Sequence, residues 1–154
     1  MDTRAGWRER RMTPAQWYAL VFGIVLLVVG ILGFFADSSF DAGSDVEGSN
    51  LLGFEVNGWH NIVHILSGLA GLAMFRLPAS ARAYALGFGA IYAVVTVWGL
   101  ITGDQVLWLV PVNGADHVLH ALIAIAGIAA GLVSNPSRFG VADEGGRRPA
   151  TGTL

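Results

Sequence analysis

The stretch Asn57-Gly58-Trp59-His60-Asn61-Ile62-Val63-His64 runs directly into an apolar segment of the chain. A related stretch, Asn113-Gly114-Ala115-Asp116-His117-Val118-Leu119-His120, opens another apolar segment 56 residues later. In each copy Asn-Gly comes first, and a histidine follows seven residues after the asparagine. Because the two stretches contain all four histidines of the chain, we interpret the remaining sequence as the scaffold that brings them together.

The composition indicates that most of the chain lies in lipid. The 154 residues are 54% hydrophobic and 13% charged, with a mean hydropathy of +0.59. A soluble domain carries about 25% charged residues. The chain has no cysteine, which excludes disulfides, thiolate metal sites and thiol catalysis.

Four apolar segments are long enough to cross a bilayer core of about 30 Å, which requires about 20 residues of helix. None contains an internal proline, and they span Trp17–Ala36, Gly58–Phe75, Ala83–Ile101 and Ala115–Val133. We therefore predict an all-α fold, a four-helix transmembrane bundle over residues 14–134. A basic segment, residues 1–13, precedes the bundle, and a disordered polar tail, residues 135–154, is expected to follow it.

The charged residues predict an orientation for this bundle. All nine arginines fall before the first segment, between the second and third, or after the fourth. The opposite side carries the acids Asp37, Asp41, Asp45, Glu47, Glu55, Asp104 and Asp116. Because basic residues concentrate in cytoplasmic loops, both termini are expected in the cytoplasm and the chain in the plasma membrane. The expected partners are membrane lipid and either further copies of the chain or a larger membrane complex, without nucleic acid.

The two histidine stretches belong to an internal repeat. An offset of 56 residues aligns Asn57 with Asn113 and His64 with His120, and in the preceding segments it aligns Gly33 with Gly89. Each repeat is then one helical hairpin. Since two-helix units keep their orientation in the membrane, the hairpins are predicted to be parallel repeats, related by an axis along the membrane normal.

The paired motifs resemble those of the actinobacterial four-helix membrane proteins grouped as domain of unknown function 4383. The resemblance covers about residues 14–133 and rests on Asn-Gly-Trp-His-Asn-Ile-Val-His and Asn-Gly-Ala-Asp-His-Val-Leu-His, each opening a membrane helix. It implies a four-helix fold in a bacterial plasma membrane. It implies no activity, so function has to be argued from the residues.

Helical periodicity gathers the polar residues of each stretch on one face. These ligand-binding candidates are Asn57, His60, Asn61 and His64 in the first stretch, and Asn113, Asp116, His117 and His120 in the second. Lipid disfavours such groups, so both faces are expected to turn inward and meet. The predicted result is a polar pocket that opens toward the outer side of the membrane.

Several uses of this pocket follow from its chemistry. His64 and His120 are placed as the two axial ligands of a b-type haem would be, and all four histidines with Asp116 suit zinc or copper(II). A carboxylate beside histidines also allows proton transfer or binding of a small polar ligand. The alternative is a structural polar network in an accessory protein, which only fixes helix packing. No catalytic residue is expected, since Ser67 is the only hydroxyl near a histidine.

Overall fold

A computed structural model describes residues 11–135 of the protein. The predicted basic segment, 1–13, and the predicted disordered tail, 135–154, therefore lie almost entirely outside the described residues. The described part contains four helices, which confirms the all-α bundle: α1 (Pro14–Ala36), α2 (Gly58–Met74), α3 (Pro78–Thr102) and α4 (Gly114–Val133).

The helices begin where local chemistry allows a helix to start. Thr13 and Gln16 form a capping box around the first turn of α1, and Pro14 and Pro78 occupy first helical positions in α1 and α3. The starts of α1 and α3 were predicted three and five residues too late, because neither proline was treated as part of its helix. Asn57 and Asn113 are the N-caps of α2 and α4; α2 begins at the predicted Gly58, and α4 begins one residue before the predicted Ala115.

Three of the helices, α1, α3 and α4, are long and apolar enough to cross a membrane. The fourth, α2, has 17 residues and is about 26 Å long at 1.5 Å per residue. Apolar side chains cover the outer surface of the bundle, among them Ile31 on α1 and Ile125 on α4. The surface thus has the character expected of helices in contact with lipid.

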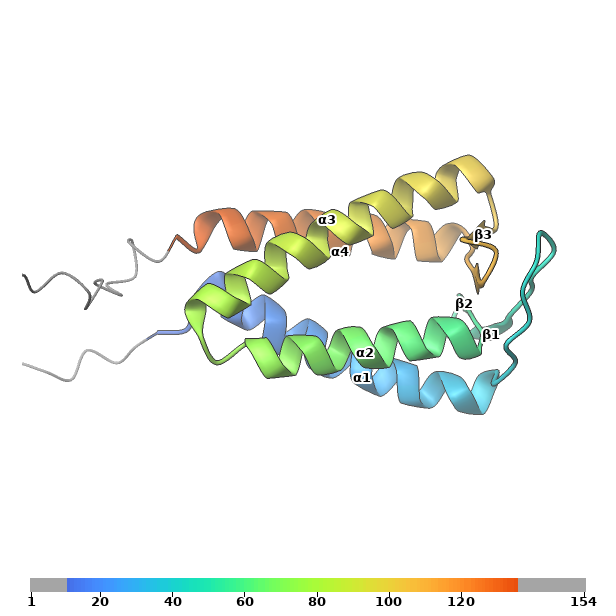
Figure 1. The fold of residues 1–154 in the computed structure, drawn as a ribbon, viewed down its shortest axis with the longest axis horizontal. Helices are drawn as coiled ribbons and strands as arrows, with labels where there is room; N and C mark the ends of the chain where they lie inside the picture. The colour runs from blue at the N-terminus through green and yellow to red at the C-terminus, as the bar shows by residue number, and fades with distance from the viewer. Residues whose placement is uncertain (1–10, 136–154) are drawn as a thin grey trace, which may run out of the picture.

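The helices form two antiparallel hairpins, α1 with α2 and α3 with α4 (Figure 1). Each hairpin contains a small antiparallel sheet between its helices, which the sequence did not predict. The strands are β1 (Ser49–Leu51) with β2 (Phe54–Val56), and β3 (Gln105–Val106) with β4 (Val110–Pro111). Strands of two or three residues are too short to show the alternation by which a strand is recognised in a sequence.

Charge separates the two ends of the bundle. The described arginines, Arg11, Arg76 and Arg82, lie at the end that carries the start of α1, the α2–α3 turn and the end of α4 (Figure 1). The seven described acids lie at the end that carries the strands. The predicted division of charge between the two ends is therefore present among residues 11–135.

The two hairpins make matching helix contacts. In each one a glycine of the first helix packs directly against the backbone of the second helix: Gly23 against Gly68 and Leu72, and Gly89 against Ala124 and Ile128. The second helices therefore correspond at an offset of 56 residues, but the first helices correspond at an offset of 66. The longer loop before α2 accounts for the difference.

This correspondence corrects one alignment. Gly33 packs against the side chain of Asn61, and Gly99 makes the same contact with the side chain of His117. By its contacts Gly33 therefore matches Gly99. The 56-residue offset of the sequence analysis had aligned it with Gly89.

Candidate metal centre

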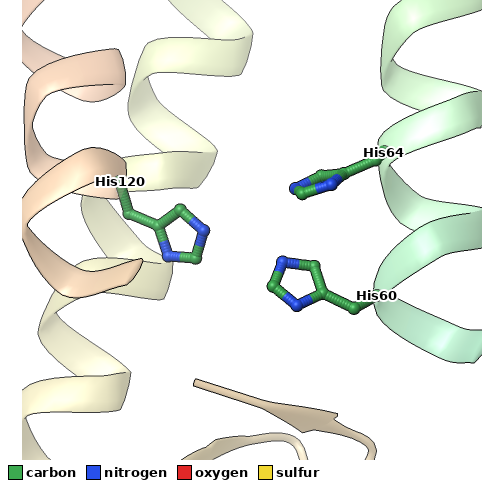
Figure 2. A group of neighbouring side chains, drawn as sticks. All are labelled: His60, His64 and His120. Atoms are coloured by element: carbon green, nitrogen blue, oxygen red, sulfur yellow. The ribbon is translucent and has the colours of Figure 1, made fainter. Parts of the chain in front are cut away.

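Three imidazole rings meet between the hairpins. His60 and His64 extend from α2 and His120 extends from α4, so that the rings face one another (Figure 2). One ligand nitrogen from each ring lies within 4.8 Å of the other two. The ring centroids of His60 and His64 are 4.4 Å apart, and those of His60 and His120 are 6.0 Å apart.

The cluster is buried. The three side chains are 2%, 7% and 4% exposed, and Val56 and Val112, which end the two strand regions, are each 1% exposed. The predicted pocket, open to the outer side, is thus a covered cluster in the structure. Burial in a low-dielectric interior strengthens every electrostatic interaction that the rings make.

Helix geometry explains two of the three positions. The side chain of Asn57 accepts a hydrogen bond from the His60 backbone N–H at 2.9 Å, which fixes the first turn of α2. His60 and His64 are then four residues apart and lie on the same face, one turn above the other. His120 lies six residues after Gly114, at the depth that His64 has after Gly58.

One nitrogen of His60 has a defined role. Its Nδ1 lies 2.8 Å from the backbone carbonyl oxygen of Glu55. A carbonyl only accepts, so Nδ1 carries the hydrogen and Nε2 keeps its lone pair. The ring is oriented with Nε2 toward the other two imidazoles (Figure 2). Such a bond from the second nitrogen is the usual way in which a protein orients a metal-binding histidine.

The other two rings have unpaired nitrogens. Within the described part of the chain, neither His64 Nδ1 nor His120 Nδ1 has a hydrogen-bond partner. The Tyr92 ring packs edge-on against His120, with centroids 5.0 Å apart, and adds an apolar wall. Sequence reasoning missed Tyr92, because it lies inside an apolar run of α3 with no polar neighbour to mark it. Buried polar atoms are nearly always hydrogen-bonded, so an unpaired nitrogen on two of three clustered rings favours a ligand. Asn61 Oδ1, Trp98 Nε1 and His117 Nδ1, outside the cluster, are also buried and unpaired in the described residues.

Asp116 lies beside the cluster. It is 1% exposed, and its Oδ2 accepts hydrogen bonds from the backbone N–H groups of Glu55 and Asn113, both at 3.0 Å. The backbone of Glu55 thus contacts both side chains, the Asp116 carboxylate through its N–H and the ring of His60 through its carbonyl. Asp116 does not belong to the group of ligand atoms within 4.8 Å of one another.

Asn57 and Asn113 connect the two hairpins. Asn57 Nδ2 donates to the Leu109 carbonyl at 2.8 Å, and Asn113 Nδ2 donates to the Gly53 carbonyl at 3.0 Å. Each asparagine therefore begins the second helix of its own hairpin and holds the strand turn of the other one. The two asparagines hold the strand turns at the buried end of the cluster, and their side chains do not extend into the cluster itself.

Asn61 and His117 do not join the three rings. Asn61 Nδ2 donates to the Asp37 carbonyl at 2.8 Å, and His117 Nε2 lies 2.9 Å from the Gly103 carbonyl. Both side chains thus bind the carbonyl of the C-cap residue that follows the first helix of their hairpin. Of the predicted ligand set, the structure brings together His60, His64 and His120, with Asp116 adjacent.

The fold and the site define a small helical bundle of the membrane-spanning type with a buried three-histidine cluster. Residues 16–133 match the model of one protein family, described as "Domain of unknown function (DUF4383)", and the chain belongs to that family. No curated protein and no solved structure matches the chain.

Proposed function

We propose that this protein binds a divalent metal ion, zinc or copper, through His60, His64 and His120. The observation that carries the proposal is the meeting of three buried imidazoles whose ligand nitrogens lie within 4.8 Å of one another, two of the rings having an unpaired Nδ1. Imidazole nitrogen suits both metals. Three protein ligands leave a fourth position for water or an external ligand, as in zinc sites that bind substrates.

The geometry requires only a small closure. Zinc–nitrogen bonds of about 2.0–2.1 Å place the ligand atoms of a tetrahedral site about 3.4 Å apart. The separations of up to 4.8 Å then have to shorten by about 1.4 Å at most. Rotation about the side-chain bonds of the histidines is sufficient for a movement of this size.

A metal ion fits the cluster better than haem does. A porphyrin held between His64 and His120 would overlap the ring of His60, whose centroid is 4.4 Å from the first and 6.0 Å from the second. The Tyr92 ring lies against His120 as well. The space needed for the macrocycle is already filled by these two rings.

The competing function is a structural one, in which the polar cluster only fixes helix packing. Hydrogen bonds between membrane helices contribute about 0.6 kcal/mol each on average. Asn57, Asn113, Asn61 and His117 make such bonds. Among the described hydrogen bonds, none joins one ring of the cluster to another, so the structural function explains those four residues better than it explains the three rings.

The chain offers a matched control for the decisive experiment. The protein is purified in mild detergent, stripped with a chelator and titrated with zinc(II) or copper(II), and its visible spectrum is recorded. We expect one metal ion per chain, lost in His64→Ala and His120→Ala but retained in His117→Ala, because His117 lies outside the cluster. A protein that binds neither metal and whose stability falls in His64→Ala would support the structural function, and a Soret band would support haem.

We also propose that all four helices cross a bacterial plasma membrane, with the arginine-bearing end in the cytoplasm. The separation of charge and the antiparallel packing of α2 along α1 support this. Because the chain has no cysteine, single reporters are simple to introduce. A membrane-impermeant maleimide applied to intact cells should label Ser44→Cys and leave Ala79→Cys unlabelled, and the reverse pattern would invert the orientation.

The matching contacts of the two hairpins support one more part of the proposal, that they are repeats of one unit. The clearest sign is reciprocal: Asn57 binds the turn of the second hairpin at Leu109, and Asn113 binds the turn of the first at Gly53. Both pairs are related by the same offset of 56 residues. The reciprocity agrees with a twofold axis that runs between the hairpins.

A further inference from the structure

One buried carboxylate has no cation beside it. Asp116 is 1% exposed, whereas the arginines of the described range, Arg11, Arg76 and Arg82, all lie at the other end of the bundle (Figure 1). Burying an uncompensated carboxylate costs several kcal/mol. A positive charge near Asp116 would therefore stabilise it, and the described chain carries no arginine or lysine at this end of the molecule.

Local structure compensates only part of this charge. Asp116 is the third residue of α4, where the positive end of the helix dipole lies. Its Oδ2 accepts the two backbone N–H bonds described above, from Glu55 and Asn113. The helix dipole and the two N–H groups carry only partial positive charges. They therefore offset only part of the negative charge of Asp116.

The three-histidine cluster is the place where such a charge would lie. The backbone of Glu55 lies between Asp116 and His60: its N–H donates to Asp116 Oδ2 at 3.0 Å, and its carbonyl oxygen lies 2.8 Å from His60 Nδ1. Asp116 thereby holds the backbone of Glu55 in the position from which its carbonyl orients His60. An ion at the rings would thus feel the negative charge of Asp116 through a dry interior.

We propose that Asp116 is the counter-charge of the centre and makes it selective for a divalent over a monovalent cation. This inference rests on the proposed metal-binding function. Three neutral imidazoles leave the full charge of a bound ion uncompensated, and Asp116 offsets one unit of it. Coulomb energy is proportional to the product of the charges. Removing the carboxylate therefore costs a doubly charged ion twice as much binding free energy as it costs a singly charged ion.

The test compares zinc(II) with silver(I), which also binds imidazole, in chloride-free buffer on the full chain. Asp116→Asn keeps the shape and an oxygen that accepts both N–H bonds, but it removes the charge. We expect zinc affinity to fall about 10- to 100-fold, the range known for residues that support metal ligands. Silver affinity should fall only by the square root of that factor, about threefold to tenfold. Asp116→Glu, which keeps the charge, should keep the preference for zinc.

Asp104→Asn is the matched control, because Asp104 is an exposed acid at the same end of the bundle, and it should change neither affinity. Asp116→Ser provides a second uncharged variant if Asp116→Asn does not elute as a folded monodisperse species. Equal losses for zinc and silver would overturn the counter-charge and leave Asp116 a residue that only orients His60. Unchanged zinc affinity in Asp116→Asn would overturn the inference entirely. A wild-type chain that binds no zinc would instead overturn the proposed function itself.

Discussion

The first hairpin, α1 with α2, and the second, α3 with α4, share their helix contacts but place different side chains at the centre. His64 and His120 occupy equivalent positions, whereas His60 corresponds to Asp116, and Asn61 corresponds to His117. A symmetric pair of hairpins would place two or four identical groups together. The difference places three imidazoles and one carboxylate at the centre, so the residues that make the matching helix contacts are not the ones that determine the chemistry of the cluster.

The strongest test of the shared framework is to fill the glycine contact in each hairpin. A Cβ at Gly23 would lie 3.0 Å from the Leu72 backbone nitrogen, and one at Gly89 would lie 2.9 Å from that of Ile128. Gly23→Leu and Gly89→Leu should each lower the free energy of unfolding by about 3 kcal/mol or more, because backbone cannot move aside. Chemical denaturation in detergent measures this loss.

Gly87→Leu is the control for both glycine variants. A Cβ at Gly87 meets no atom of the described chain within 4 Å, so this variant should be no less stable than the wild type. The correspondence between the hairpins predicts similar losses at Gly23 and Gly89. A loss of stability in only one of the two variants would contradict the correspondence between the two hairpins.

A smaller effect is expected from the two reciprocal asparagines. Asn57→Ala removes an N-cap and a bond to the other hairpin, and Asn113→Ala removes the equivalent pair of bonds. We expect losses of about 2 kcal/mol for Asn57, which is fully buried, and about 1 kcal/mol for Asn113, which is partly exposed. Thermal unfolding in detergent measures both.

The control for the asparagines is Asn50→Ala, whose side chain bonds only within its own turn, to the Gly53 amide. It should change stability by less than about 0.5 kcal/mol. If Asn113→Ala changed stability as little as Asn50→Ala, the second hairpin would not depend on the turn of the first. The reciprocal hydrogen bonds would then contribute nothing measurable to stability.

The helices could be predicted from the sequence, because long apolar segments without proline are its strongest signal. The correspondence between Gly33 and Gly99 could not be predicted, because one sequence offset applied to the whole repeat ignores the longer loop of the first hairpin. The strands of two or three residues and their turns were also missed. Leu52, Leu107 and Trp108 adopt positive φ without being glycine. Only the first turn contains a residue that usually marks such a position, Gly53, and the second turn has none.

The site was predicted in part for a similar reason. Helical periodicity placed His60, His64 and His120 on inward faces, and the structure brings these three together. The same period also placed His117 on the inward face of α4. Periodicity does not decide which neighbour a residue at the edge of a face will contact, and here Gly99 provides a space on α3 that receives the His117 ring.

The smallest expected effect concerns the two equivalent helix ends at Asp37 and Gly103. Both carbonyls accept a bond from the second helix, but only Asp37 carries a titratable group. Hydrogen bonds from the Ser39 hydroxyl and amide, and from the Ser49 hydroxyl, hold the pKa of the Asp37 carboxyl below its ordinary value of 3.8. The ionised form therefore stabilises the folded loop above pH 3.8, and this contribution is lost as the pH falls through the lower, folded-state pKa.

Acid should thus loosen the loop that follows α1 at a pH below 3.8. The Ser39 amide resonance, followed by NMR during acid titration in detergent, should give a midpoint below 3.8 for Asp37. Ser39→Ala should raise that midpoint, because the hydroxyl is the largest cause of the shift, whereas Ser38→Ala should leave it in place. A midpoint at or above the ordinary value would show that the serines do not stabilise the carboxylate. The two helix ends would then differ in sequence without differing in their response to acid.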